Sequence, residues 1–357
     1  MGTSHGTRDE ADHLAVDVIV NNYQYARYLP RAIDSALAQT HSSVRVIVVD
    51  DGSTDGSRDV IGSYGDRIET VLKENGGQAS AVNAGMLRSR GDIVIFLDAD
   101  DELEPEAASR VAAAFAARPD LARVHYRLRV MDGDGALTDE LKPPDRLALA
   151  AGDLRDATLH CPFDAAWLPT SGNAFRASDL RRILPVPEEE YRLCADWYLV
   201  HVSSLLGPVG AIDDALGRYR VHAANGFTRS DGRLDLEHVA DTAEYAAITR
   251  RHLIEVAHRE GMPAEADQMA SMCDVANRAI LARLAAGADS RRRLFGLGVR
   301  SCRVRRDVGP AMKLMFISWL GLTLVAPRRQ AARLGELFLL PESRPALDDL
   351  LGRLHRT

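Results

Sequence analysis

Three aspartates stand together where a short apolar segment ends. Residues 93–97 form a nearly uninterrupted apolar run, typical of a strand buried on both faces, and Asp98, Asp100 and Asp101 follow it. Residues two apart on an extended chain point the same way, so the carboxylates of Asp98 and Asp100 can converge. Converging carboxylates repel each other unless a cation lies between them. The sequence therefore predicts a divalent-metal site that holds phosphates. An acidic start to the helix after Pro105 is the alternative.

Two other apolar segments also end in polar residues. Residues 16–21 predict a strand that delivers Asn21 and then Tyr23, whose ring can stack on a nucleobase or cover the edge of the core. Residues 44–49 predict a strand followed by Asp51, which can accept hydrogen bonds from a base or ribose, although this loop can also cap the next helix. Ligands of open α/β sheets bind beyond the carboxyl ends of the strands, so we expect these residues at one edge.

Four more candidates lie further along the chain. Asn83 falls within a predicted helix and either faces a ligand or hydrogen-bonds a neighbouring loop. Asp196 begins an apolar helix, as a helix cap or as a functional acid. Arg220 and His222 lie two residues apart at the end of a predicted strand and so share a face. Arginine there can contact phosphate, and the imidazole can ligate Mn²⁺, contact a diphosphate or serve a structural role.

The elements that must position these residues follow an α/β pattern in the first half of the chain, where short apolar runs alternate with amphipathic segments. The segments predicted as strands are residues 16–21, 44–49, 68–72, 93–97, 123–130 and 216–221. The segments predicted as helices are residues 28–39, 58–64, 78–90, 106–117 and 195–206. Residues 132–160 are rich in Gly, Asp and Pro and predict mostly loop.

The character of the sequence changes near residue 230. Beyond it, Ala, Leu, Glu and Arg dominate, glycine is rare, and helices are predicted near residues 236–261, 264–286 and 290–300. We therefore expect a flexible tail over residues 1–15, a catalytic domain over 16–230 and a helical region over 231–357. Residues 314–327 carry no charge and are flanked by arginines, but are too short to span a membrane. They predict a helix buried in the bundle, with an interfacial membrane helix or a dimer contact as alternatives.

Composition narrows the class of protein. The chain has 357 residues, of which 46% are hydrophobic and 27% charged, as expected for a soluble globular protein of about two domains. The formal net charge of −7 does not suggest a nucleic-acid partner. The four cysteines lie far apart without metal-ligand spacing, and the start of the chain lacks an apolar signal core. These features predict a cytoplasmic protein, with peripheral attachment to the inner face of a membrane as an option.

Seven sequence blocks occur in an order that resembles the family 2 glycosyltransferases, inverting enzymes with a GT-A fold. They span about residues 16–226 and read VDVIVNNYQYARYLPRAIDSALAQT, VIVVDDGSTDGS, ENGGQASAVNAG, DIVIFLDADDELEP, SGNAFRAS, LCADWYLV and GRYRVHAANG. The resemblance implies an α/β nucleotide-sugar-binding domain with a mixed, mostly parallel sheet flanked by helices. Two departures stand out: Gln24 replaces a common asparagine, and Ala195 precedes Asp196 where the family usually has a second acid.

The resemblance also implies roles for the candidate residues. It places Asp51 against uracil, Asp98 in the ribose or metal shell, and Asp100 as a direct ligand of Mn²⁺ or Mg²⁺. It assigns Asp196 as the catalytic base, which suits an apolar setting because burial raises a carboxylate's proton affinity. Contacts with the donor or the departing diphosphate are implied for a wider set, namely Asn21, Tyr23, Asn83, Arg220 and His222.

The function predicted is therefore a metal-dependent, inverting, hexosyltransferase-type enzyme. It would use a nucleotide-diphosphate sugar, with a UDP-sugar favoured, and a glycan, lipid-linked, peptide or small-molecule acceptor. A homodimer is a further option. The alternatives are a sugar-phosphate nucleotidyltransferase, which would need a basic, Gly-rich loop after the first strand, and a catalytically silent nucleotide-sugar-binding subunit, against which the acids at positions 51, 98, 100 and 196 argue.

Overall fold

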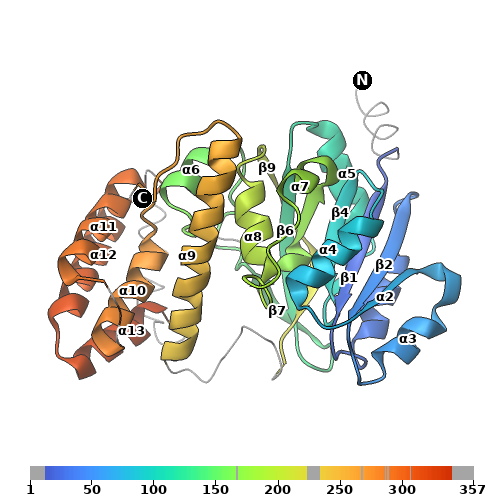
Figure 1. The fold of residues 1–357 in the computed structure, drawn as a ribbon, viewed down its shortest axis with the longest axis horizontal. Helices are drawn as coiled ribbons and strands as arrows, with labels where there is room; N and C mark the ends of the chain where they lie inside the picture. Colours follow the sequence, from blue (N-terminus) through green and yellow to red (C-terminus); the bar gives the residue numbers. More distant parts are fainter. Residues whose placement is uncertain are drawn as a thin grey trace. The chain divides into compact units, whose positions relative to one another are not determined.

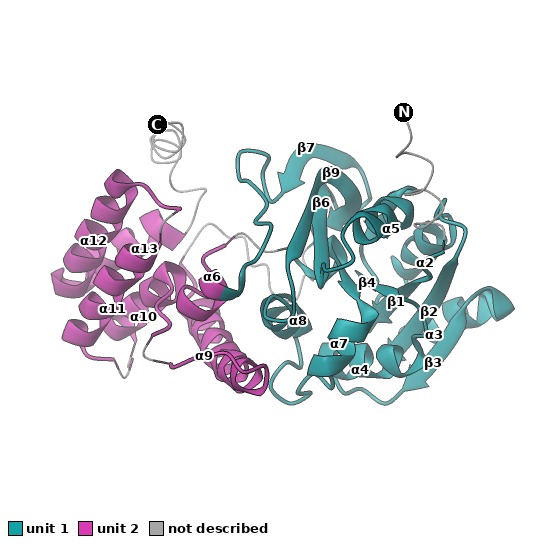
Figure 2. Cartoon of the chain, turned by 90° about the horizontal axis from the view of Figure 1, so that it is seen from above, with its two compact units in different colours: residues 1–155, 166–226 teal, residues 156–165, 227–357 magenta. Residues whose placement is uncertain are grey.

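A computed structural model describes residues 13–165, 168–222, 234–266, 268–285, 287, 289–305 and 307–339. The predicted tail over residues 1–15 lies mostly outside these ranges. The chain divides into two compact units, coloured separately in Figure 2. Unit 1 comprises residues 1–155 and 166–226, and unit 2 comprises residues 156–165 and 227–357. Unit 2 thus includes a short segment that the sequence analysis placed in the catalytic domain.

Unit 1 is built on one mixed sheet, which is nine-stranded in the part of the chain that is described (Figure 1). The order is β3-β2-β1-β4-β8-β6-β9-β5, with β7 paired to β6. The strands β1 to β4 are mutually parallel, whereas β8 runs antiparallel to both of its neighbours. The strands are β1 (Val16–Asn22), β2 (Val44–Asp51), β3 (Glu69–Lys73), β4 (Ile93–Asp98), β5 (Glu102–Leu103), β6 (Arg123–Met131), β7 (Leu137–Lys142), β8 (Asn173–Arg176) and β9 (Val209–Arg220).

Helices cover both faces of this sheet. Helices α2 and α5 pack on one face, and α4, α7 and α8 lie on the other (Figure 2). The helices of unit 1 are α2 (Leu29–Leu37), α3 (Ser57–Ser63), α4 (Gln78–Arg88), α5 (Ala107–Ala117), α7 (Ala177–Ile183) and α8 (Ala195–Ser203), with 3₁₀ turns η1 (Gly65–Arg67) and η2 (Thr170–Gly172). A helix–sheet–helix arrangement buries β1 completely, which explains why Val16 and residues 18–20 are apolar.

One charged residue is buried within β1. Asp17 is fully buried and accepts hydrogen bonds from Arg45 Nε at 2.9 Å and Nη2 at 2.8 Å. The backbone N–H groups of Arg90 and Gly91 also donate to it, each at 2.7 Å. Burial alone would raise the pKa of Asp17, but the bonds from Arg45, Gly91 and Arg90 bring that pKa below its usual value. Asp17 therefore ties β1 to β2 and to the turn before β4.

The structure confirms the mixed sheet flanked by helices and corrects residues 132–160. This segment was predicted as mostly loop, but it contains β7 and α6 (Arg155–His160). β7 was missed because its sequence, Leu, Thr, Asp, Glu, Leu and Lys, has neither an apolar run nor a regular alternation, and none of its residues is fully buried. β9 begins at Val209, seven residues before the predicted strand. The prediction missed the first half of β9 because Asp213 and Asp214 interrupt its apolar residues.

Unit 2 is helical. Its core consists of side chains from every long helix of the unit. These helices are α9 (Leu236–Arg259), α10 (Met272–Leu284), α11 (Arg291–Val304), α12 (Pro310–Val325) and α13 (Arg328–Leu339). α12 corresponds to the uncharged segment at 314–327. Its inner face is buried through Phe316 and Leu320, as predicted, but Leu314 and Val325 are exposed. Among the described residues, no helix has the length and apolar character needed to cross a bilayer.

Candidate active site

The predicted acidic cluster forms where β4 ends. Asp98 is the last residue of β4, and the chain then turns into β5, which pairs antiparallel with β9. Glu102 of β5 is aligned with Arg218, so the end of β9 runs beside the acidic turn. His222 follows β9, and its Nε2 atom lies 2.9 Å from Oδ2 of Asp100. Both side chains are largely buried, at 6% and 11% exposed. The fold thus brings together two predicted metal ligands that are distant in the sequence.

Arg220 supports this turn from inside the protein. It is 1% exposed, and its backbone N–H donates to Asp101 Oδ1 at 2.9 Å. Its guanidinium donates to the carbonyl of Asp100 at 2.8 Å, to Glu102 Oε1 at 2.7 Å and to the carbonyl of Asp132 at 3.3 Å. All three nitrogens are directed to protein acceptors. Arg220 therefore positions the acidic turn, and its predicted contact with the donor stays a prediction.

The carboxylates of the cluster raise one another's pKa. Burial is the main reason that the pKa of Asp98 rises to about 8, and the charges of Asp100 and Asp196 raise it further. Burial, followed by the charges of Asp100 and Asp98, also raises the pKa of Asp101 well above its usual value. Repulsion of this kind favours either protonation or a bound cation.

Gln78 connects the acidic cluster to the helix that carries Asp196. Its Nε2 donates to Asp98 Oδ1 at 3.1 Å, and its Oε1 accepts from the backbone N–H of Ala195 at 2.8 Å. Gln78 is the first residue of α4, and Ala195 is the first residue of α8. One amide thus fixes the start of α8 relative to the end of β4. The sequence analysis did not single out Gln78, because only the fold reveals this bridge.

Asp196 lies in the first turn of α8, as predicted. Its Oδ1 accepts the N–H of Trp197 at 3.0 Å, and its side chain is half-buried. Burial raises the pKa of Asp196 to about 6, although the hydrogen bond from Trp197 and the charge of Lys142 act in the opposite direction. At neutral pH this carboxylate is mostly ionised and is more basic than an exposed aspartate.

Lys142 is a cation of the site that the sequence analysis missed. It is the last residue of β7, and its Nζ lies 3.8 Å from the ring centroid of Tyr219, within range of a cation–π interaction. Burial lowers the pKa of Lys142, and the charges of Asp101 and Asp196 oppose that change. The ammonium group of Lys142 therefore interacts with the charges of Asp101 and Asp196, two acids of the candidate site. Lys142 escaped notice because its strand lies in the segment predicted as loop.

The end of β1 supplies amide and aromatic groups. Asn21 is 8% exposed, and neither polar atom of its side chain has a hydrogen-bond partner in the described part of the chain. Asn21 is also aligned with Asp98 across the β1–β4 pair. The ring of Tyr23 is 47% exposed, which leaves its face available for stacking. The rings of Tyr25 and Tyr28 lie 5.6 and 4.9 Å from that of His222, and so hold the imidazole in place.

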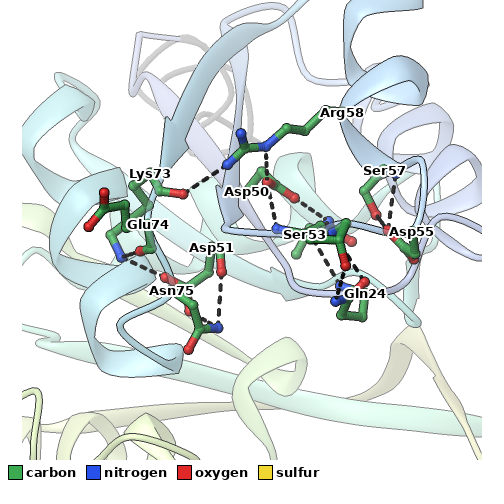
Figure 3. Close-up of polar contacts among 12 residues, drawn as sticks. Gln24, Asp50, Asp51, Ser53, Asp55, Ser57, Arg58, Lys73, Glu74 and Asn75 are labelled. Carbon is green, nitrogen blue, oxygen red and sulfur yellow. Dashed lines mark hydrogen bonds and ion pairs between the residues drawn. The ribbon is translucent and has the colours of Figure 1, made fainter.

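Asp51 organises the loop before α4, as Figure 3 shows for Lys73 and Asn75. Its Oδ1 accepts from Lys73 Nζ at 2.5 Å and from the N–H of Gly76 at 2.9 Å. Its Oδ2 accepts from Asn75 Nδ2 at 3.1 Å and from the N–H of Gly77 at 2.6 Å. Each oxygen has two donors, which fills its ordinary capacity. The prediction that Asp51 contacts a base thus competes with a structural role.

The neighbouring Asp50 has a structural role. It accepts from Asn22 Nδ2 at 2.8 Å, from the N–H of Ser53 at 3.0 Å and from Arg58 Nε at 2.9 Å (Figure 3). Burial would raise the pKa of Asp50, but the bonds from Ser53, Arg58 and Asn22 lower it below the usual value. None of these donors is a backbone N–H of α3, which begins at Ser57, so Asp50 holds the loop together and does not cap the helix.

Asn83 makes the loop contact that was the alternative to a donor contact. Its Oδ1 accepts the N–H of Val186 at 2.8 Å, and its Nδ2 donates to the carbonyl of Val186 at 2.9 Å and to Glu188 Oε1 at 3.1 Å. Both ends of the amide are therefore used inside the protein. These contacts favour the alternative interpretation of Asn83, and its predicted contact with the donor stays a prediction.

The residues present fit a metal that is shared with a phosphate ligand. Within the described residues, no group of three or more His, Cys, Asp or Glu side chains is arranged to hold a metal by itself. Asp100 and His222 supply one oxygen and one nitrogen ligand, a combination that suits Mn²⁺. Mg²⁺ is commonly held by one or two carboxylates together with substrate phosphates and water. The raised pKa of Asp98 also fits, because a cation would offset the repulsion among the acids.

Comparison with known proteins identifies the family and the fold. The family model described as glycosyl transferase family 2 matches residues 17–158. An uncharacterised glycosyltransferase of Nostoc sp. is 37% identical over 216 residues, which cover 59% of this chain and 66% of the relative. A Rickettsia prowazekii glycosyltransferase, also uncharacterised, is 44% identical over 90 residues, which cover 25% of this chain and 28% of the relative. The chain thus spans about two thirds of one relative and about a quarter of the other.

Solved structures share the fold over most of the chain. Residues 1–349 of Staphylococcus aureus TarS match with a TM-score of 0.54 and 14% identity, covering 91% of each chain. The same TarS fragment has been solved in complex with UDP-GlcNAc. The mannosyltransferase PcManGT of Pyrobaculum calidifontis, in complex with GDP-Man and Mn²⁺, matches with a TM-score of 0.50 and 17% identity, covering 90% of this chain and 84% of that one. At these identities the likeness establishes the shared GT-A fold.

Proposed function

Because the chain belongs to glycosyltransferase family 2, we propose that it is a metal-dependent, inverting, hexosyltransferase-type enzyme that uses a nucleotide-diphosphate sugar. The acceptor nucleophile attacks the anomeric carbon in line with the leaving group. A bond forms from the acceptor oxygen or other nucleophile to that carbon, while the bond from the carbon to the diphosphate oxygen breaks. The diphosphate leaves with the bonding electrons, and Asp196 takes the acceptor's proton. One displacement of this kind inverts the anomeric configuration.

The contact between Asp100 and His222 carries the proposal. Two side chains 122 positions apart are held at 2.9 Å beside a crowded group of acids, at the edge of the sheet where ligands of α/β proteins bind. We assign Asp100 and His222, with Asp98, to the metal. A bound Mn²⁺ or Mg²⁺ would supply charge neutralisation for the departing diphosphate. Arg220 holds the backbone of this turn in place, so the ligands are preorganised by a buried contact.

Asp196 suits the role of general base. A base works best when its pKa lies near the operating pH, and the pKa of Asp196 is raised to about 6. Lys142 keeps that pKa from rising further, which maintains the ionised form at neutral pH. Gln78 fixes the start of α8 against Asp98, and so sets the spacing between the base and the metal-binding acids.

The end of β1 is assigned to the nucleotide. The exposed ring of Tyr23 offers a stacking surface, and the buried amide of Asn21 offers a donor and an acceptor. We favour a UDP-sugar, a choice supported by the family pattern around Asp51 and by the UDP-GlcNAc complex of TarS. The acceptor class is a hydroxyl or other nucleophile of a glycan, lipid-linked, peptide or small-molecule compound.

The test is titration calorimetry with UDP, GDP, dTDP and CDP, with and without Mn²⁺. We expect one nucleotide, UDP, to bind at least tenfold more tightly with Mn²⁺ than without it. Tyr23→Ala should weaken that binding by about 1–3 kcal/mol, because one base-stacking surface is lost. Equal binding of every nucleotide with and without Mn²⁺ would contradict the proposal. Tyr64→Phe is a matched control, since Tyr64 hydrogen-bonds Asp34 and the carbonyl of Pro30 instead.

A further inference from the structure

Residues 291–339 have a charge opposite to that of the rest of the chain. They contain ten arginines and one lysine, but Asp307 and Glu336 are their only acids, which gives a formal net charge of +9. The whole chain has a net charge of −7, so the excess of acids lies elsewhere. Asp307 is also paired with Arg305 at 2.5 Å. The last helices of unit 2 thus form a strongly basic segment within an acidic protein.

The central helix of this segment, α12, is apolar on its outer face as well as its inner face. Leu314, Leu322 and Val325 are 69%, 58% and 73% exposed. They are eight and three residues apart, spacings that place side chains on one face of a helix. Phe316 and Leu320 lie on the opposite side, in the core of the bundle. Packing within the bundle therefore leaves Leu314, Leu322 and Val325 of α12 without a buried position.

The neighbouring helices extend this outer face and surround it with arginines. Phe295 of α11 is 40% exposed and lies beside Gly321 of α12, where an added Cβ would be 3.5 Å from its ring. Arg292 and Arg303 are three residues before and eight residues after Phe295, and so lie on the same side of α11. Both are exposed.

The same arrangement recurs on α13. Leu337 is 46% exposed, and the exposed Arg333 lies one turn before it. We call the outer surface of α11 and α12 the apolar–basic face. It consists of Phe295, Leu314, Leu322 and Val325, with Arg292 and Arg303 on the same side of α11 as Phe295.

We propose that the apolar–basic face docks on the surface of an anionic lipid bilayer. Exposed leucine, valine and phenylalanine side chains would enter the boundary between headgroups and acyl chains, and the surrounding arginines would contact lipid phosphates. A second copy of this chain fits the face less well, because pairing two such faces would oppose arginine to arginine. The proposal does not depend on the glycosyltransferase activity, and its test measures lipid binding alone.

The test is co-flotation of the full chain with lipid vesicles. One set contains phosphatidylcholine alone, and the other contains about one third phosphatidylglycerol. We expect binding to the anionic vesicles only, and weakening as salt is raised, since screening reduces the attraction of arginines to the surface. Leu322→Glu and Val325→Glu should each weaken binding about tenfold, because each removes an inserted apolar side chain and adds a repelled charge. Arg303→Glu should weaken it at least fivefold.

Leu87→Glu is the matched control. Leu87 is 86% exposed on α4 of unit 1, so the change adds the same charge away from the face and should leave vesicle binding unchanged. Circular dichroism and thermal melting verify that each variant is folded. The proposal is overturned if the wild type does not bind anionic vesicles, or if Leu322→Glu binds as the wild type does. It is also overturned if light scattering shows a dimer that Leu322→Glu dissociates, or if binding requires removal of residues 340–357.

Discussion

Replacing Asp196 by asparagine should abolish transfer and, at the same time, stabilise the protein. Burial raises the pKa of Asp196 from the usual 3.8 to about 6, so the folded state favours the neutral acid. The difference corresponds to about 2–3 kcal/mol that the ionised carboxylate costs the folded state at neutral pH. Asparagine has a similar shape and no charge, and its Oδ1 can still accept the N–H of Trp197. It also removes one of the charges that raise the pKa of Asp98.

The stability gain should depend on pH in a defined direction. Well below pH 3.8, Asp196 is protonated in both the folded and the unfolded states, so its ionisation contributes no difference in stability. As pH rises from 3.8 to about 6, the unfolded state releases its proton first, so the wild type loses stability relative to Asp196→Asn. Above about pH 6 the difference should be constant. At 2–4 °C per kcal/mol for a unit of this size, it amounts to about 4–12 °C in Tm.

The assay is thermal unfolding of both proteins from pH 3.5 to 8, without nucleotide or metal. Asp50→Asn is the control with the opposite sign. Hydrogen bonds from Ser53, Arg58 and Asn22 hold the pKa of Asp50 below its usual value, so its ionised form stabilises the folded state above pH 4. Asp50→Asn should therefore lower Tm at pH 7. If Asp196→Asn has the same Tm as the wild type at pH 7, or a lower one, the reasoning about the buried base is refuted.

Three further predictions concern groups around the site. Lys142→Met should move the acidic limb of the pH profile of kcat/KM above pH 6, because the charge of Lys142 lowers the pKa of Asp196. An unmoved limb would mean that Lys142 does not influence the pKa of Asp196. His222→Ala should weaken nucleotide binding at least tenfold with Mn²⁺ and leave metal-free binding unchanged in calorimetry. An equal loss with and without Mn²⁺ would mean that His222 is not a metal ligand. Arg220→Leu should lower the free energy of unfolding in urea by about 3 kcal/mol, because Glu102 loses its buried partner and keeps only Arg218; a raised KM at unchanged stability would indicate that Arg220 contacts the donor instead.

The parts of the fold that the sequence predicted are those with strong local signals. β4 is a continuous apolar run from Ile93 to Leu97, and β1 is apolar from Val16 to Val20 apart from Asp17. Both strands are buried, and their pattern leaves little choice of structure. β7 has no such signal, because it pairs with β6 alone and is largely exposed. The strand that carries Lys142 was therefore predicted as loop, and Lys142 was lost with it.

The candidate site was likewise predicted only in part from the sequence. The sequence analysis named Asp100 and His222 as candidate metal ligands, and the structure places their side chains 2.9 Å apart. The internal partners of Arg220 and Asn83 were not predicted, because sequence shows that a polar side chain is present but not which partner it meets. Arg220 lies opposite Met131 of β6 and meets the acidic turn, and Asn83 meets Val186 where that residue approaches α4. Such partners are set by tertiary contacts.

The most direct test of the proposed mechanism compares donor binding with donor turnover in the wild type and Asp196→Asn. Calorimetry with the favoured nucleotide sugar and Mn²⁺ gives Kd, and release of the nucleoside diphosphate gives turnover. We predict equal Kd for the two proteins and at least a 100-fold loss of release in the variant, as expected when a general base is removed. Release by Asp196→Asn at the wild-type rate would contradict the account, because the proton of the attacking nucleophile would then be taken by another group.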